Sequence, residues 1–140
     1  MRIALQQAQI AFDKDEIPIG AVIVANKIVI AKAYNMTQQL NDVTAHAEML
    51  AFTAASAYLQ SKYLNECTLY VTIEPCPMCA GAAFWTHLSR LVFGAEDPKR
   101  GYQLISSELL HPATVVKKGV MAEQCGELMS DYFKSKRKKF

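Results

Sequence analysis

Apolar side chains follow helical spacing at the start of the chain and strand spacing soon afterwards. Residues 2–14 carry apolar positions at intervals of three and four, which predicts an amphipathic helix. The runs 19–25 and 28–33 are rich in β-branched residues and are joined around Asn26 and Lys27. Two such runs with a short polar connection predict an antiparallel hairpin.

The rest of the chain alternates helices with single strands. After a polar connection at 34–43, Thr44 is a candidate N-cap for a helix rich in Ala, Leu and Met. We expect that helix at 45–59, then a buried strand at 67–73, a helix at 77–85, a strand at 91–95, an irregular loop at 96–113, a short strand at 114–118 and a last helix at 121–134. Single strands separated by helices predict an α/β fold, with a mixed sheet and helices on both faces.

Length and composition agree with one globular domain. The chain has 140 residues, of which 51% are hydrophobic and 20% charged. We assign a single domain to residues 1–134 and a basic tail to residues 135–140. No apolar run reaches the length of about 20 residues that crosses a bilayer. The first 16 residues lack a secretion-signal pattern, so we expect a cytoplasmic protein without a membrane partner.

Charge is distributed unevenly along the chain. The net charge is +2, yet residues 134–140 hold five of the 15 basic residues and no acidic one. The preceding 133 residues carry 10 basic and 13 acidic groups, which is a net charge of −3. A basic end on a mildly acidic body is typical of a segment that binds a polyanion, and it is also compatible with a solvated tail that only aids solubility.

The four cysteines fall into two classes. Cys76 and Cys79 form a C-x-x-C pair, which in a cytosolic enzyme indicates a metal site or a redox pair. Cys67 lies in a predicted strand and Cys125 in a predicted helix. A domain of this size needs no disulfides in a reducing compartment, so we expect both to be buried thiols.

Two short motifs, His46-Ala47-Glu48 and Cys76-Pro77-Met78-Cys79, each fall where a helix is expected to begin. Residues three apart share a helical face, so the two thiols can bind one ion and the histidine can complete the set. Three protein ligands leave a tetrahedral position open, which is typical of catalytic zinc. The carboxylate of Glu48 beside an activated water can shuttle protons. Together, H-x-E and P-C-x-x-C form the signature of zinc nucleobase deaminases.

Longer stretches of the chain extend this pattern. Beyond the motifs, the chain resembles the bacterial tRNA adenosine deaminases (TadA), within the cytidine deaminase superfamily. The matching stretches are IPIGAVIV (17–24), NDVTAHAEMLA (41–51), CTLYVTIEPCPMCAGA (67–82), SRLVFGAEDPKRG (89–101) and the end region 119–138. The resemblance implies a three-layer α/β/α fold around a five-stranded mixed sheet, a homodimer with one zinc ion per subunit, and conversion of adenosine to inosine at the wobble position of the tRNA anticodon.

The resemblance also implies roles for individual residues. His46, Cys76 and Cys79 would be the zinc ligands and Glu48 the proton shuttle. Asn35 would bind the target nucleoside through its side chain, and Ala47 through its backbone N–H. Contacts to the RNA outside the target nucleoside would come from Asp97 and Lys99 for the flanking nucleotides, and from Tyr132, Phe133, Lys134 and Arg137 for the anticodon stem. Only one of the two adjacent aromatics can face the RNA, so we expect the other to pack into the core.

Two alternatives remain open at this point. Trp85 is also typical of guanine deaminases, which would make the protein a small-molecule nucleobase deaminase acting on guanine or cytosine; a core or dimer-interface position is the other interpretation of this residue. The stretch Gly101-Tyr102-Gln103 departs from the family pattern, so RNA contacts there can differ. The second alternative is a zinc-stabilised RNA-binding module without catalysis, and the presence of Glu48 disfavours it.

Overall fold

A mixed sheet of five strands, in the order β2-β1-β3-β4-β5, organises residues 1–137, which are the residues that the computed structural model describes. The elements are α1 (Arg2–Asp13), β1 (Gly20–Ala25), β2 (Ile28–Tyr34), α2 (Ala47–Leu59), β3 (Cys67–Ile73), α3 (Pro77–Thr86), β4 (Arg90–Ala95), β5 (Val115–Lys118) and α4 (Ala122–Arg137). Strand β1 is antiparallel to both β2 and β3, whereas β3, β4 and β5 run parallel.

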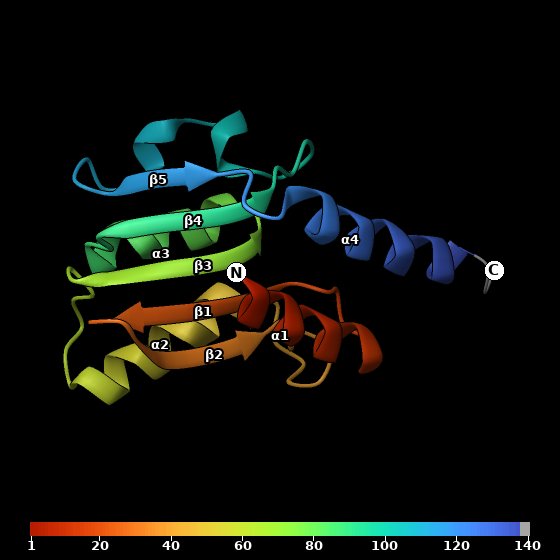
Figure 1. The fold of residues 1–140 in the computed structure, drawn as a ribbon, viewed down its shortest axis with the longest axis horizontal. Helices are drawn as coiled ribbons and strands as arrows, with labels where there is room; N and C mark the ends of the chain where they lie inside the picture. Colours follow the sequence, from red (N-terminus) through yellow and green to blue (C-terminus); the bar gives the residue numbers. More distant parts are fainter. Residues whose placement is uncertain (138–140) are drawn as a thin grey trace.

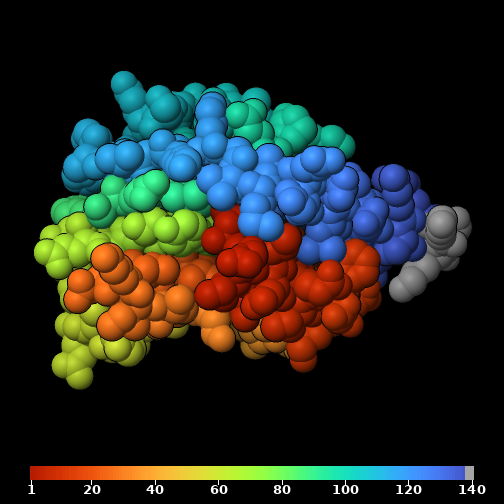
Figure 2. Space-filling model, in the orientation of Figure 1, coloured from red at the N-terminus to blue at the C-terminus, as the bar shows by residue number. Residues whose placement is uncertain are grey.

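The helices form two layers, one on each face of the sheet. Figure 1 shows α1 and α4 on one face and α2 and α3 on the other. The space-filling view shows α1 and α4 side by side on the first face (Figure 2), and the aromatic rings of Phe12 and Tyr132 join them. The predicted three-layer α/β/α arrangement is confirmed.

Apolar side chains between these layers form the core. Ile23, Leu69, Leu91 and Phe93 are buried in the sheet and pack against the helices. On the α1 face the contact is close, because a Cβ on Gly20 would lie 2.0 Å from the carbonyl oxygen of Ala4. Glycine is required there for the approach of the helix backbone rather than for a special backbone angle.

The start of α2 differs from the expected one. Thr44 is not its N-cap, because α2 begins at Ala47 and His46 is the capping residue. The Asp42 carboxylate accepts hydrogen bonds from the backbone N–H and the hydroxyl of Thr44, at 2.8 and 2.7 Å. An Asx-type turn of this kind competes with helical hydrogen bonds and delays the helix by two residues. The delay leaves the His46 side chain free for another role.

The other differences concern boundaries. Two 3-10 turns, η1 (Tyr102–Leu104) and η2 (Ser107–Leu109), interrupt the loop expected at 96–113. Helix α4 continues to Arg137, so residues 135–137 are helical. The division into a domain at 1–134 and a tail at 135–140 stays a prediction, and residues 138–140 lie outside the described part. Both Cys67 and Cys125 are buried free thiols, as expected. Within residues 1–137, no helix is both long and apolar enough to cross a membrane.

Candidate active site

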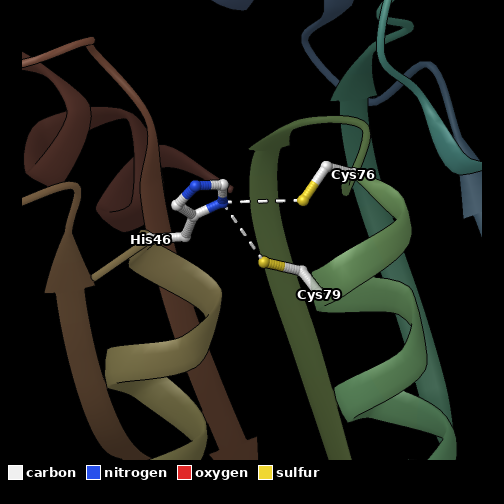
Figure 3. A group of neighbouring side chains, drawn as sticks. All are labelled: His46, Cys76 and Cys79. Atoms are coloured by element: carbon white, nitrogen blue, oxygen red, sulfur yellow. Dashed lines mark hydrogen bonds between the residues drawn. The ribbon is translucent and has the colours of Figure 1, made fainter. Parts of the chain in front are cut away.

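Two helix starts meet on the face of the sheet that α2 and α3 cover. His46 is the N-cap of α2 and Cys76 is the N-cap of α3, and each has extended backbone angles. Neither side chain forms a capping hydrogen bond to its own helix. Cys79 lies in the first turn of α3, after Pro77, which is well suited to a first helical position. The three side chains therefore point toward one another, as Figure 3 shows.

The spacing of the three ligand atoms suits a metal ion. The Nδ1 atom of His46 lies 3.6 Å from Cys76 Sγ and 3.5 Å from Cys79 Sγ. Usual zinc–nitrogen and zinc–sulfur bond lengths in a tetrahedral site separate these atoms by about 3.5 Å. Among residues 1–137, the possible ligand atoms of His46, Cys76 and Cys79 all lie within 4.8 Å of one another. The donor set predicted from the sequence is positioned to bind a metal.

Hydrogen bonding among the three side chains favours one thiolate and leaves protons on the other two groups. The Cys79 thiol, as hydrogen-bond partner, lowers the pKa of Cys76 to about 4, and His46 contributes to the same shift. The pKa of Cys79 is raised by the same contact with Cys76 and by burial. The pKa of His46 is raised, first by its contact with Cys76. Cys76 thus forms a thiolate readily, and a bound cation would displace the protons that the raised pKa values keep on Cys79 and His46.

Glu48 lies in the first turn of α2 with a 3% exposed side chain. Its Oε1 atom is the buried side-chain oxygen that has no hydrogen-bond partner among residues 1–137. Burial raises the pKa of Glu48 to about 7, against the opposing effect of its own backbone N–H. An unpaired buried acceptor is costly, and such groups gather where a substrate or water is bound. The arrangement therefore offers a proton acceptor beside the three ligand atoms.

Asn35 comes directly after β2, and the loop that follows it leads back to His46. The backbone N–H of Met36 donates to the carbonyl of Ala45 at 3.0 Å, which closes the loop 36–45 at its base. Asn35 directly precedes Met36, and His46 directly follows Ala45. Asn35 and Ala47 are both buried. The hydrogen bond between Met36 and Ala45 therefore brings the backbone of Asn35 close to that of His46, eleven positions later.

The loop between β4 and η1 carries Asp97 and Lys99. Asp97 is half-buried, and its Oδ1 atom accepts the backbone N–H groups of Lys99 and Arg100, at 3.0 Å each. Lys99 is exposed. Tyr102, by contrast, is buried and packs edge-on against Phe93. The exposed side chains of this loop are therefore available to a ligand, whereas the Tyr102 ring belongs to the core.

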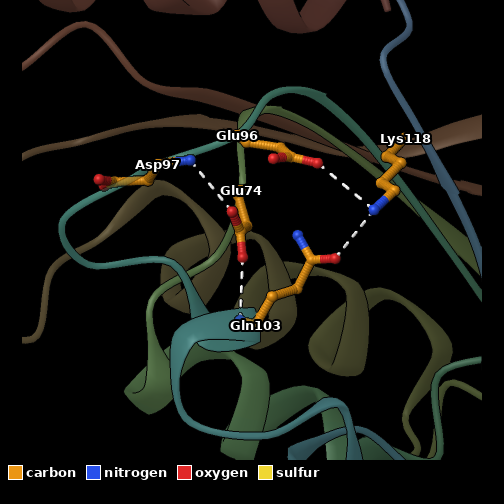
Figure 4. Close-up of polar contacts among 5 residues, drawn as sticks. All are labelled: Glu74, Glu96, Asp97, Gln103 and Lys118. Carbon is orange, nitrogen blue, oxygen red and sulfur yellow. Dashed lines mark hydrogen bonds and ion pairs between the residues drawn. The ribbon is translucent and has the colours of Figure 1, made fainter.

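Sequence reasoning gave no role to Glu74 and Glu16. Glu74 accepts backbone N–H groups from Asp97 and Gln103, as Figure 4 shows, and Glu16 accepts those of Gln38 and Gln39. Both carboxylates are buried. Each of these glutamates adjoins an apolar segment of the sequence, which is the one signal that it could be buried. Since charged groups are rarely buried unless they are paired, a buried glutamate at such a position would be expected to have hydrogen-bond partners.

The last helix separates its two aromatic residues. Tyr132 is 7% exposed, and its ring lies edge-on to Phe12 at a centroid distance of 5.7 Å. Its hydroxyl donates to the carbonyl of Asp15 at 3.3 Å. Phe133, Lys134 and Arg137 are exposed. Tyr132 therefore holds α4 against α1, and the other three remain available as RNA contacts; their binding role stays a prediction.

Trp85 projects from the end of α3. The side chain is 74% exposed and lines a shallow hollow with Tyr63 and His87. An exposed tryptophan of this kind does not belong to the core, which removes one of the two ordinary interpretations of this residue. An interface position remains, because exposed apolar patches mark binding surfaces.

Known proteins of similar sequence and structure are deaminases. The family model of the MafB19-like deaminases matches residues 1–137. A tRNA-specific adenosine deaminase of Bacillus subtilis is 42% identical and covers 99% of this chain, with 89% of its own length aligned. A solved structure from work on A-to-I editing by tRNA:A34 deaminases at the wobble position is 41% identical, with a TM-score of 0.85 over 91% of this chain and 96% of its own. A guanine deaminase from Bacillus subtilis is 38% identical, with a TM-score of 0.65 over 68% of this chain and 61% of its own.

Proposed function

The chain belongs to the family of tRNA-specific adenosine deaminases, and from this we propose that it hydrolyses adenosine to inosine at the wobble position of tRNA anticodons. The observation that carries the proposal is the buried Oε1 of Glu48, which has no partner within residues 1–137 and lies two residues from His46. A purely structural metal site has no use for such a group. A cytoplasmic location is part of the proposal, because translation uses the product there.

We propose one zinc ion per subunit, held by His46, Cys76 and Cys79. Their nitrogen and sulfur donors are those that zinc prefers, and their separations fit a tetrahedral site. A bound zinc ion supplies Lewis acidity, which makes water nucleophilic near neutral pH. The positive ends of α2 and α3 both face the ligands and favour the thiolate form.

The carboxylate of Glu48 moves the protons of the reaction. Its Oε1 takes a proton from the attacking water and delivers it to the ring nitrogen next to the amine-bearing carbon. The carbon–nitrogen bond then breaks, and a second proton leaves with ammonia. Adenosine and water thus give inosine and ammonia, and no covalent bond to the protein forms. A pKa near 7 suits a group that accepts and donates in turn.

The surrounding residues hold the RNA. We propose that Asn35 and the backbone of Ala47 bind the target nucleoside, and that Asp97 and Lys99 contact its neighbours. Single-stranded loops release a base at low cost, which suits an anticodon. We propose that the basic end of α4, including Lys134 and Arg137, binds phosphates of the stem, and the cluster of basic residues in its last turn supports this.

We further propose a homodimer in which the exposed surface around Trp85 is covered. Tyr63 and Trp85 line the same hollow, and both are exposed in the single chain. Large exposed aromatics are typical of interface centres. Sedimentation of wild type and Trp85→Glu tests this proposal. Dimers of the wild type and monomers of the variant support it, and identical sedimentation of the two contradicts it.

The decisive experiment is an inosine assay on an anticodon stem-loop, run beside ammonia release from guanine, cytosine and free adenosine. We expect turnover of the stem-loop by the wild type and none by Glu48→Ala, with equal zinc content in both proteins. Similarity to a guanine deaminase and the presence of Trp85 favour a small-molecule substrate as the second candidate. Turnover of guanine without turnover of the stem-loop would establish that alternative. RNA binding with zinc but without inosine would indicate a non-catalytic module.

A further inference from the structure

Glu74 occupies the junction between β3 and the metal-binding turn. It follows Ile73, the last residue of β3, and precedes Pro75 and Cys76. Its side chain is 5% exposed, and its backbone N–H donates to the carbonyl of Ala95 at 2.8 Å. The position of Glu74 is therefore fixed by the sheet, one residue away from the turn that carries a candidate ligand.

The carboxylate of Glu74 reaches across to the loop that follows β4. Oε1 accepts the backbone N–H of Asp97 and Oε2 accepts that of Gln103, each at 3.0 Å (Figure 4). The carbonyl of Pro75 accepts the N–H of Tyr102 at 2.9 Å. Hydrogen bonds to a carboxylate are about twice as strong as neutral ones. We call the carboxylate of Glu74 with the N–H groups of Asp97 and Gln103 the Glu74 clamp.

Gly101 makes the clamp possible. A Cβ at this position would lie 2.3 Å from the carboxylate carbon of Glu74 and from its Oε1. The φ angle of Gly101 is −63°, so any residue could adopt its backbone conformation. The glycine is needed for space: the loop wraps the carboxylate so closely that no side chain fits between them.

We propose that Glu74 is a positioning residue that sets the affinity for the nucleotides next to the target adenosine, by holding the 97–103 loop in register with the Cys76 turn. This inference rests on the proposed function, because it assigns RNA contacts to that loop. The clamp uses the two ends of the loop, Asp97 and Gln103, and leaves the exposed Lys99 between them free to reach a ligand. The reactive centre and the flanking contacts then move as one rigid unit.

Glu74→Gln tests the clamp with almost no change of shape. A glutamine amide keeps one acceptor oxygen, and its NH2 group cannot accept the second backbone N–H. We expect faster amide hydrogen exchange over 97–103 and unchanged exchange over 36–45. Glu16→Gln is the matched control, because Glu16 accepts two backbone N–H groups from the other loop. In Glu16→Gln, amide exchange should be faster over 36–45 and unchanged over 97–103. Unchanged exchange over 97–103 in Glu74→Gln would overturn the proposal.

Kinetics on the stem-loop test the consequence for RNA. In the zinc-loaded protein, we expect Glu74→Gln to raise KM about tenfold, since one charge-assisted hydrogen bond is lost. The value of kcat should change by less than about threefold, because the ligands and Glu48 are untouched. Gly101→Ala should also raise KM, because its Cβ would displace the carboxylate end of Glu74. Gly126→Ala is the control and should have no effect, because its Cβ would make only an ordinary contact of 3.7 Å with the Cβ of Ala95. A fall in kcat with unchanged KM would overturn the proposal.

The double variant separates the clamp from general loosening of the fold. Glu74→Gln and Gly101→Ala remove the same contact, so the combined variant should raise KM no further than the larger single effect. A product of the two effects, about a hundredfold, would overturn the proposal. If the wild type makes no inosine on the stem-loop, the proposed function fails in that control alone, and the exchange experiment still decides whether Glu74 positions the loop.

Discussion

Two buried glutamates flank the candidate metal site and have opposite surroundings. Glu48 lies two residues after His46 in the first turn of α2, and Glu74 lies two residues before Cys76 at the end of β3. Within the described residues, one oxygen of Glu48 has no partner, whereas both oxygens of Glu74 accept backbone N–H groups. Burial alone therefore does not distinguish the carboxylate that we propose to be reactive; the hydrogen-bond count does.

Glu16 supports this distinction. It is fully buried near the end of α1 and accepts the N–H groups of Gln38 and Gln39 at 3.0 and 2.7 Å. The loop it binds joins Asn35 to His46, just as the loop bound by Glu74 carries Asp97 and Lys99. Two satisfied carboxylates thus hold the loops on either side of the site, and Glu48, with one unpaired oxygen among the described residues, is the candidate for chemistry.

Loss of a metal ligand should have the largest effect. We expect Cys79→Ala to bind less than about a tenth of the zinc of the wild type and to have no measurable deaminase activity, because two remaining ligands do not hold zinc tightly. Metal analysis of the purified protein and the inosine assay measure both quantities. Cys67→Ala is the control, since this buried thiol lies in β3 outside the metal-binding group. Retention of a full equivalent of zinc by Cys79→Ala would contradict the assigned ligand set.

Glu48→Gln should be the next largest effect and should change rate without changing metal content. The amide cannot take the proton from water, so kcat should fall by about a thousandfold. The free energy of unfolding should stay the same or rise, because a buried carboxylate with one unpaired oxygen is replaced by a neutral group. Steady-state inosine assays measure kcat, and urea unfolding measures the free energy of unfolding. A rate close to that of the wild type would show that Glu48 is not the proton shuttle.

Glu16→Gln should lower stability more than rate, which is the reverse of the effect expected for Glu48→Gln. One backbone N–H in the 36–45 loop loses its acceptor, and an unsatisfied buried donor costs about 1–3 kcal/mol. We expect that loss in the free energy of unfolding, with a decrease of kcat smaller than that of Glu48→Gln. Urea unfolding compared with Glu48→Gln under the same conditions provides the measurement. Equal stabilities of these two variants would contradict the distinction between paired and unpaired carboxylates.

The sequence predicted the metal-binding group and missed the loop contacts for a physical reason. His46, Cys76 and Cys79 lie at helix starts, where short motifs and helical spacing carry the information locally. The partners of Glu74 are backbone groups 23 and 29 residues away, and no side-chain pattern marks a backbone donor. Thr44 is a candidate cap of α2 because it has a favoured cap side chain, but its backbone N–H and hydroxyl are both bound by Asp42. The separation of Tyr132 from Phe133 was predictable, because adjacent helical residues face different directions.

The smallest effect is expected at the exposed side of the 97–103 loop, where Lys118 of β5 contacts it. Lys118 lies 3.3 Å from the Glu96 carboxylate and donates to the side-chain oxygen of Gln103 at 3.1 Å, with more than half of its side chain exposed (Figure 4). Exposed ion pairs contribute less than about 1 kcal/mol, because water and salt screen them. We expect Lys118→Met to change the free energy of unfolding by less than about 0.5 kcal/mol and to leave amide exchange over 97–103 unchanged. Exchange as fast as that of Glu74→Gln would mean that the surface contacts, rather than the buried carboxylate, hold the loop.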